Sequence, residues 1–156
     1  MNYRIKPIDR RLADKVRETM RSPQYGHPAF REAATGYGPC RQCLRTFDAG
    51  NEDRILFTYN ALEGILDVPL PGPVFIHADK CEGYSDMAFP PDLIDLPLLF
   101  ECYAADGSII RTAPVDRKCA ESQIATLLNE TRAKFINIRN AEAGCHIAKI
   151  LPAVTG

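Results

Sequence analysis

The sequence contains no long apolar segment. Its longest apolar runs extend over a handful of residues, such as the run that ends at Phe100, whereas a membrane-spanning helix needs about 20. The first seven residues also lack the apolar stretch that marks a signal peptide. We therefore expect a cytoplasmic protein that does not enter a membrane.

Internal repeats, low-complexity tracts and glycine clusters are missing as well. The lack of a repeat excludes solenoids and propellers. No glycine cluster follows a strand pattern and opens a helix, so the phosphate-loop, dinucleotide-binding and serine-hydrolase fingerprints are absent. What is present is typical of a globular protein, since 46% of the 156 residues are apolar and 25% are charged. This length predicts a single domain over residues 1–156.

Neither sign of charge is in excess, but the charges are segregated. The net charge is −1 overall, with +4 in residues 1–54, −8 in residues 55–110 and +3 in residues 111–156. This balance disfavours binding to nucleic acid. The acidic middle can face the basic flanks of the same chain, or those of a second copy in a homo-oligomer. Alternatively, its segment 79–106 can serve a non-catalytic interaction module.

Hydrophobic periodicity predicts two main helices and six or seven strands. Helix 10–21 would follow an N-cap at Asp9, and helix 117–131 would follow an N-cap at Asp116. Most neighbouring strands are joined by turn signals, which favours an α+β fold with a mostly antiparallel sheet. The strands are expected at residues 3–6, 54–59, 74–77, 98–104, 108–112, 134–140 and 145–151.

Two segments are predicted to be irregular. Residues 68–73 contain three prolines, which remove three donors from any strand ladder. Residues 23–39 are rich in Pro, Gly and Tyr and are expected to form a loop with one helical turn around residues 30–34. A loop of this length in a small domain is more often functional than incidental.

Six cysteines are many for a cytoplasmic chain, and four residues form a suggestive set. Cys40 and Cys43 are separated by two residues, and His77 and Cys81 by three. Both spacings suit a tetrahedral zinc ion held by three sulfurs and one imidazole. However, no glycine accompanies the Cys-Arg-Gln-Cys segment to let it fold back.

The local sequence predicts instead that residues 40–44 are extended. In an extended segment Cys40 and Cys43 point to opposite faces and cannot share an ion. We therefore favour buried core thiols at these positions and keep zinc as the alternative. A redox role for the Cys40–Cys43 pair is disfavoured, because no helix start follows the first cysteine. Adjacent Cys145 and His146 would also point to opposite faces of a strand, which argues against a nucleophile–base pair there.

Binding of a small ligand is the leading functional interpretation. The pocket would be framed by loops 23–43 and 77–87, with polar groups that converge on it. Its candidate ligand-binding residues are Arg41, His77, Cys81 and Tyr37. The sequence does not identify a ligand or a reaction.

Several blocks of the chain resemble a known bacterial family. These are the residues from Gly38 to Leu44, Ile55 to Tyr59 and Gly72 to Ala78 with Cys81, and Asn140 followed by Gly144-Cys145. They resemble the characteristic blocks of domain-of-unknown-function family 1203, and the likeness covers essentially the whole chain. The resemblance implies no activity, cofactor or catalytic residue.

Overall fold

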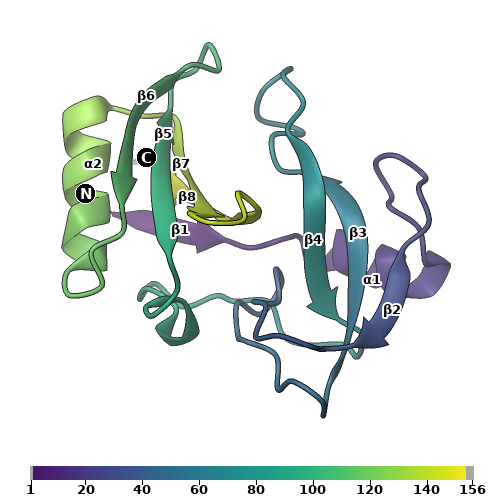
Figure 1. Cartoon of the computed structure of the whole chain (residues 1–156). Coiled ribbons are helices and arrows are strands. Elements are labelled where there is room, and N and C mark those ends of the chain that lie inside the picture. Colours follow the sequence, from purple (N-terminus) through teal and green to yellow (C-terminus); the bar gives the residue numbers. More distant parts are fainter. Residues whose placement is uncertain (1, 154–156) are drawn as a thin grey trace. The chain divides into compact units, whose positions relative to one another are not determined.

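The structure, a computed structural model, describes residues 2–153 and divides into two compact units (Figure 1). One unit is Pro7–Tyr84, and the other combines Met1–Lys6 with Ser85–Gly156. We call them the three-stranded unit and the five-stranded unit after their sheets. All strand pairs in both sheets are antiparallel, which confirms the α+β class. Each unit has its own sheet. That residues 1–156 form a single domain stays a prediction.

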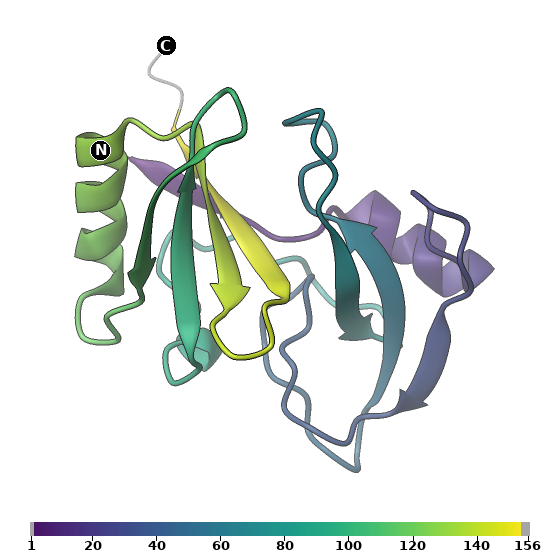
Figure 2. The ribbon, with the colours of Figure 1, turned by 45° about the horizontal axis from the view of Figure 1, so that its top comes forward.

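The five-stranded unit packs one helix on one face of its sheet (Figure 2). The strand order is β1-β8-β7-β5-β6. Apolar side chains on β5, β7, β8 and β1 line up across the sheet, as in the row Cys102, Ile136, Ile150 and Ile5. All four are buried, and α2 buries its own apolar stripe. The elements are β1 (Tyr3–Lys6), η1 (Pro91–Leu93), β5 (Leu98–Tyr103), β6 (Ile109–Pro114), α2 (Ala120–Thr131), β7 (Phe135–Asn140) and β8 (His146–Pro152).

The other face of the same sheet carries buried polar side chains. Glu101, Asn137 and Lys149 are neighbours across three strands and are all at most 5% exposed. The Asn137 amide donates to Glu101 at 2.9 Å, and its oxygen lies 2.6 Å from Nδ1 of His146. Arg139 completes the cluster with an ion pair to Glu101 at 3.2 Å. Such buried groups need partners, and this network supplies them to Glu101 and Asn137.

The three-stranded unit packs α1 (Arg10–Thr19) against a sheet with the order β2-β3-β4. These strands are β2 (Phe30–Ala33), β3 (Asp53–Asn60) and β4 (Pro71–His77). Ala13 and Val16 of α1 share one hydrophobic core with Phe57 of β3 and Ile76 of β4. The predicted N-cap is confirmed, because the Asp9 side chain accepts a hydrogen bond from Arg11 N at 2.8 Å.

Three local predictions were wrong. Phe30–Ala33 is strand β2 and not a helical turn, because it pairs with residues 53–56 of β3. Helix α2 begins at Ala120 with Cys119 as its N-cap, three residues later than predicted, and the Asp116 side chain instead accepts from Lys118 N.

The third concerns residues 68–73, which were expected to be irregular. Pro71–Pro73 belong to β4, because β4 lies at the edge of its sheet and an edge strand tolerates prolines.

In the part of the chain that the structure describes, neither helix is long and apolar enough to cross a membrane.

The buried Lys149 predicts a specific pH dependence of stability. Burial, and secondarily the charge of Lys6, lower the pKa of Lys149 to about 8, compared with about 10.4 in the unfolded chain. The protonated amine therefore destabilises the folded protein below pH 8, and this penalty disappears as the pH rises from about 8 to 10.4. We expect Lys149→Met to be more stable than the wild type at pH 7, by up to about 3 kcal/mol.

Urea unfolding of both proteins from pH 7 to 10 measures this difference. The advantage of Lys149→Met should shrink as the pH rises through 8. Lys118→Met, at an exposed position of the same unit, is the matched control and should show no such trend. A difference between Lys149→Met and the wild type that stays constant over this range would contradict the prediction.

Candidate metal centre

A tight turn places Cys40 and Cys43 side by side. Leu44 N donates to Cys40 O at 2.9 Å, and Cys40 N donates to Arg45 O at 2.9 Å, so the chain folds back on itself. Leu44 adopts the left-handed conformation, with φ of 59°, that a glycine would adopt more readily. The prediction of an extended segment at residues 40–44 was therefore wrong, and the objection that this segment raised against a shared ion does not hold.

The end of β4 brings the other two residues of the set to this turn. His77 is the last residue of β4, and Cys81 follows it after three residues. One sulfur or nitrogen atom from each of Cys40, Cys43, His77 and Cys81 lies within 4.8 Å of the others. Two of the separations are 3.9 Å, between Cys40 Sγ and Cys81 Sγ, and 3.4 Å, between Cys43 Sγ and His77 Nδ1. Ligands of a tetrahedral zinc ion would be about 3.5–3.8 Å apart, given bonds of about 2.0–2.3 Å.

Backbone N–H groups point at two of the sulfurs. His77 N donates to Cys40 Sγ at 3.3 Å, and Arg45 N donates to Cys43 Sγ. Both contacts favour a negatively charged sulfur, the form in which cysteine binds a metal. The turn and the end of β4 thus each supply one backbone donor to a sulfur of the cluster.

His77 is oriented from both sides of its ring. Its Nε2 lies 3.1 Å from Glu52 Oε2, while its Nδ1 faces Cys43. Glu52 also accepts from Asp48 N at 2.8 Å, and this bond, followed by contact with His77, lowers the pKa of its carboxyl group. Phe47 packs against the imidazole with ring centroids 4.6 Å apart. A carboxylate on the outer nitrogen of a metal-binding histidine is a common arrangement, because it fixes the tautomer.

Arginine side chains surround the sulfur atoms. The Arg17 side chain is 8% exposed, and its guanidinium reaches Cys81 Sγ at 3.7 Å, the His77 carbonyl at 3.0 Å and Gln42 Oε1 at 2.7 Å. The Arg45 side chain donates to Cys43, a contact that raises the pKa of Arg45. Two positive charges therefore lie next to a set of groups that becomes negative when the thiols ionise.

The titration of the cluster follows from these contacts. Hydrogen bonds from Cys40 and Cys81 hold the pKa of Cys43 well below its usual value, with a smaller contribution from His77. Hydrogen bonds to Cys40 and Cys43 raise the pKa of His77 to about 10, and the pKa of Cys81 is also raised by its contacts with these two cysteines. Both directions favour the charged forms of Cys43 and His77.

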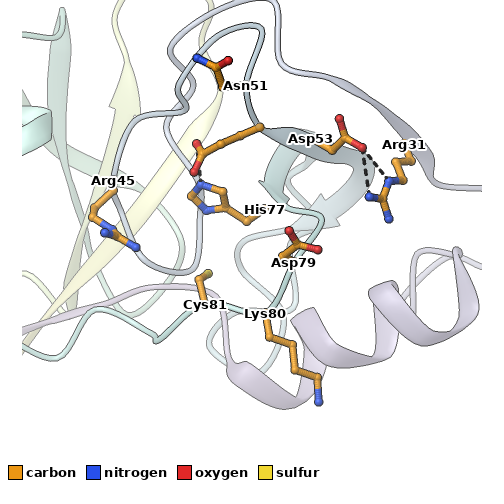
Figure 3. A pocket seen from close by; sticks show the side chains of 9 residues that line it. Arg31, Arg45, Asn51, Asp53, His77, Asp79, Lys80 and Cys81 are labelled. Atoms are coloured by element: carbon orange, nitrogen blue, oxygen red, sulfur yellow. Dashed lines mark hydrogen bonds and ion pairs between the residues drawn. The ribbon is translucent and has the colours of Figure 1, made fainter.

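A pocket of about 330 Å³ opens beside the cluster (Figure 3). His77 and Cys81 line it, and charged side chains form most of the remaining wall. Arg31 and Asp53 form an ion pair at 3.0 Å on one side of His77, and Arg45 lies on the other side in this view. The remaining lining residues are Asn51, Glu52, Asp79 and Lys80.

Two of the four candidate ligand-binding residues line this pocket and two do not. His77 and Cys81 line the pocket, whereas Arg41 and Tyr37 are not among its lining residues. Arg41 is buried, and its guanidinium donates to the Pro39 carbonyl. Tyr37 is 51% exposed.

Two other residues considered in the sequence analysis, Glu101 and His146, lie in the five-stranded sheet. Within the acidic segment 79–106, Glu101 is buried in the five-stranded sheet, so this acid is not exposed to a partner. His146 contacts Asn137 rather than Cys145.

Sequence reasoning missed Arg17 and Glu52, which contact the cluster, whereas Arg45, which also contacts it, flanks Cys43 in the sequence. Arg17 precedes Cys81 by 64 residues and Glu52 precedes His77 by 25, so no short spacing connects them. The only signal in the sequence was the basic character of the residues that flank Cys40 and Cys43.

A family model described as "Protein of unknown function (DUF1203)" matches residues 37–151. The chain belongs to this family. The match includes all four residues of the cluster and most of the five-stranded unit. The chain matches no curated protein and no solved structure.

The close approach of Phe47 to Gly38 predicts that an alanine destabilises the protein at position 38 but not at position 36. Gly38 has φ of 93°, and an added Cβ would lie 2.6 Å from Cε2 of Phe47, the ring that packs on His77. We expect Gly38→Ala to destabilise the protein by about 2–4 kcal/mol, through overpacking and backbone strain. Gly36→Ala is the control, because no atom lies within 4 Å of its added Cβ. Urea unfolding measures the stability of both variants. Equal free energies of unfolding would contradict the prediction, because the Phe47 ring would then move aside at no cost.

Proposed function

We propose that the three-stranded unit binds one zinc ion through Cys40, Cys43, His77 and Cys81. The observation that carries the proposal is the convergence of the four ligating atoms within 4.8 Å, from two segments separated in the sequence. The N–H donors at the sulfurs and the carboxylate behind His77 support it, because they are the contacts that a metal site needs around its ligands.

The ligand types favour zinc over other metals. Three thiolates and one imidazole are soft ligands, which disfavours magnesium and calcium. The short separations fit a single ion, whereas an iron–sulfur cluster would hold the cysteine sulfurs farther apart. Zinc with three thiolates carries a net charge of −1, and Arg17 and Arg45 lie where they offset it.

The proposed role of the ion is structural. Four protein ligands complete a tetrahedral shell and leave no open position for a substrate. The ion would join the Cys40–Arg45 turn to the end of β4, and so would fix the loop that follows β2 onto the sheet. Metal binding would then contribute directly to the folding free energy of this unit.

Elemental analysis of the purified protein tests the proposal directly. We expect one zinc per chain, lost when any one of Cys40, Cys43 or Cys81 is replaced by serine. Removal of the metal by a chelator should lower the midpoint of thermal unfolding by more than 10 °C, since zinc at micromolar affinity or better contributes several kcal/mol. Substoichiometric zinc that is unchanged in these variants would contradict the proposal.

Two further cysteines provide matched controls. Cys119 is exposed and Cys145 is partly exposed, and both belong to the five-stranded unit. Cys119→Ser and Cys145→Ser should keep a full complement of zinc. If these variants lose zinc to the same extent as Cys81→Ser, the loss does not come from the proposed ligands.

Glu52 provides a separate prediction, because it contacts the ligand and not the ion. Glu52→Gln should weaken zinc binding by about 10–100-fold, since the hydrogen bond to Nε2 of His77 loses its charge. Glu82→Gln removes the same charge next to Cys81 from an exposed position and should change the affinity far less. Competition with a chromogenic chelator measures both affinities, and equal effects of the two variants would argue for a general charge effect.

A small polar ligand in the adjoining pocket is a second candidate function. The observation that favours it is the pocket of about 330 Å³ with positive and negative side chains on its walls. Arg45 and Lys80 would face anionic groups of such a ligand, and Asp79 a cationic one. Native mass spectrometry of the zinc-loaded protein would reveal a retained small molecule, and Lys80→Ala should then reduce its occupancy.

A further inference from the structure

The four proposed zinc ligands are not equally protected. Cys40, Cys43 and His77 are buried, with Cys40 fully inaccessible. Cys81 is only partly buried and lines the pocket beside the cluster. A small molecule in the pocket can therefore reach the sulfur of Cys81 without displacing core residues, whereas Cys40 has no exposed surface and does not line the pocket.

The surroundings of Cys81 favour reaction at its sulfur. The sulfur of Cys40 lies 3.9 Å from that of Cys81, and a disulfide requires a separation of about 2.05 Å. A movement of about 2 Å would join them. Zinc binding keeps Cys81 as a thiolate. The Arg17 guanidinium lies 3.7 Å from the Cys81 sulfur, so a positive charge is near the hydroxide that leaves when this sulfur is oxidised.

We infer that Cys81 is an oxidation site for hydroperoxides, and that its oxidation forms a disulfide with Cys40 and releases the zinc ion. This inference rests on the proposed zinc site and assigns a means of regulation to it. Hydrogen peroxide is much smaller than the pocket, so the pocket gives it access to the sulfur.

The reaction proceeds in two balanced steps. In the first, the Cys81 thiolate attacks one oxygen of hydrogen peroxide, the O–O bond breaks, and hydroxide leaves a sulfenic acid on Cys81. In the second, the Cys40 thiolate attacks the sulfur of that sulfenic acid, the S–O bond breaks, and a second hydroxide leaves as the disulfide forms. The two sulfurs together lose two electrons, the peroxide gains two, and solvent protons convert both hydroxides to water.

Oxidation would remove two of the four zinc ligands at once. Cys43 and His77 alone leave the ion with half of its ligands, so it should dissociate. The disulfide would keep the Cys40–Arg45 turn linked to the segment after β4, so loss of the metal need not unfold the unit. A thiol reductant together with zinc should restore the starting state.

The experiment treats the zinc-loaded full-length protein with increasing equivalents of hydrogen peroxide. Released zinc is followed with a chromogenic chelator, and disulfides are mapped by mass spectrometry after the free thiols are blocked. We expect one zinc released per peroxide consumed, together with a disulfide between Cys40 and Cys81. The double variant Cys119→Ser, Cys145→Ser should release zinc as the wild type does. Arg17→Met, which keeps all four ligands, should release it several-fold more slowly.

Two outcomes would overturn the inference. One is zinc that stays bound at peroxide levels that already oxidise the exposed Cys119. The other is zinc release with a Cys40–Cys43 disulfide in place of the predicted one. Zinc content before oxidation separates the two proposals, because a protein that binds no zinc at the start refutes the metal site itself. A loaded protein that resists peroxide refutes only the oxidation site.

Discussion

Three sulfur atoms and one imidazole nitrogen meet within 4.8 Å at the end of β4, and the three-stranded unit is organised around this meeting point. The sheet of this unit has only three strands, and one helix covers it. The long segment between β2 and β3 has little regular structure to hold it. A small unit of this kind gains limited stability from its apolar core alone. The hydrogen bonds of the Cys40–Arg45 turn and its contacts with His77 and Cys81 therefore have a large influence on the position of this segment.

Arg17 connects this turn to the rest of the unit. Its guanidinium contacts the Cys81 sulfur, the His77 carbonyl and the Gln42 side chain, and it also forms an ion pair with Asp14 on its own helix. One side chain on α1 therefore contacts both segments that carry the cluster. The positive charge beside the Cys81 sulfur also fixes the helix to the end of β4.

The sequence predicted the regular, apolar parts of the fold well, and the reasons are local. Strands such as β3 and β7 and the stripe of α1 show clear hydrophobic periods, so their positions could be predicted within a residue or two. Strand β2 could not be predicted, because all four of its residues are exposed and follow no alternation. The polar row that includes Glu101 and Lys149 also gave no signal, since its members meet only when the sheet forms.

The candidate site was predicted in part for a similar reason. The spacings of the cysteines and His77 pointed to the four residues that converge at the end of β4, but the local sequence indicated the wrong backbone conformation between Cys40 and Cys43. Leu44 adopts a left-handed conformation that leucine rarely takes, and its burial and its hydrogen bond to Cys40 O hold it there. The burial of Leu44 and this turn hydrogen bond outweigh the local preference, and the burial depends on the folded unit and not on the neighbouring residues.

The prolines of β4 have a consequence for how this protein can associate. Pro71 and Pro73 lie at the edge of the three-stranded sheet and carry no N–H group, so the free side of β4 offers few donors to an incoming strand. Another chain cannot readily extend the sheet from that side. Growth by strand addition would have to begin at β2, where Arg31 and Glu32 place charges on the opposite edge.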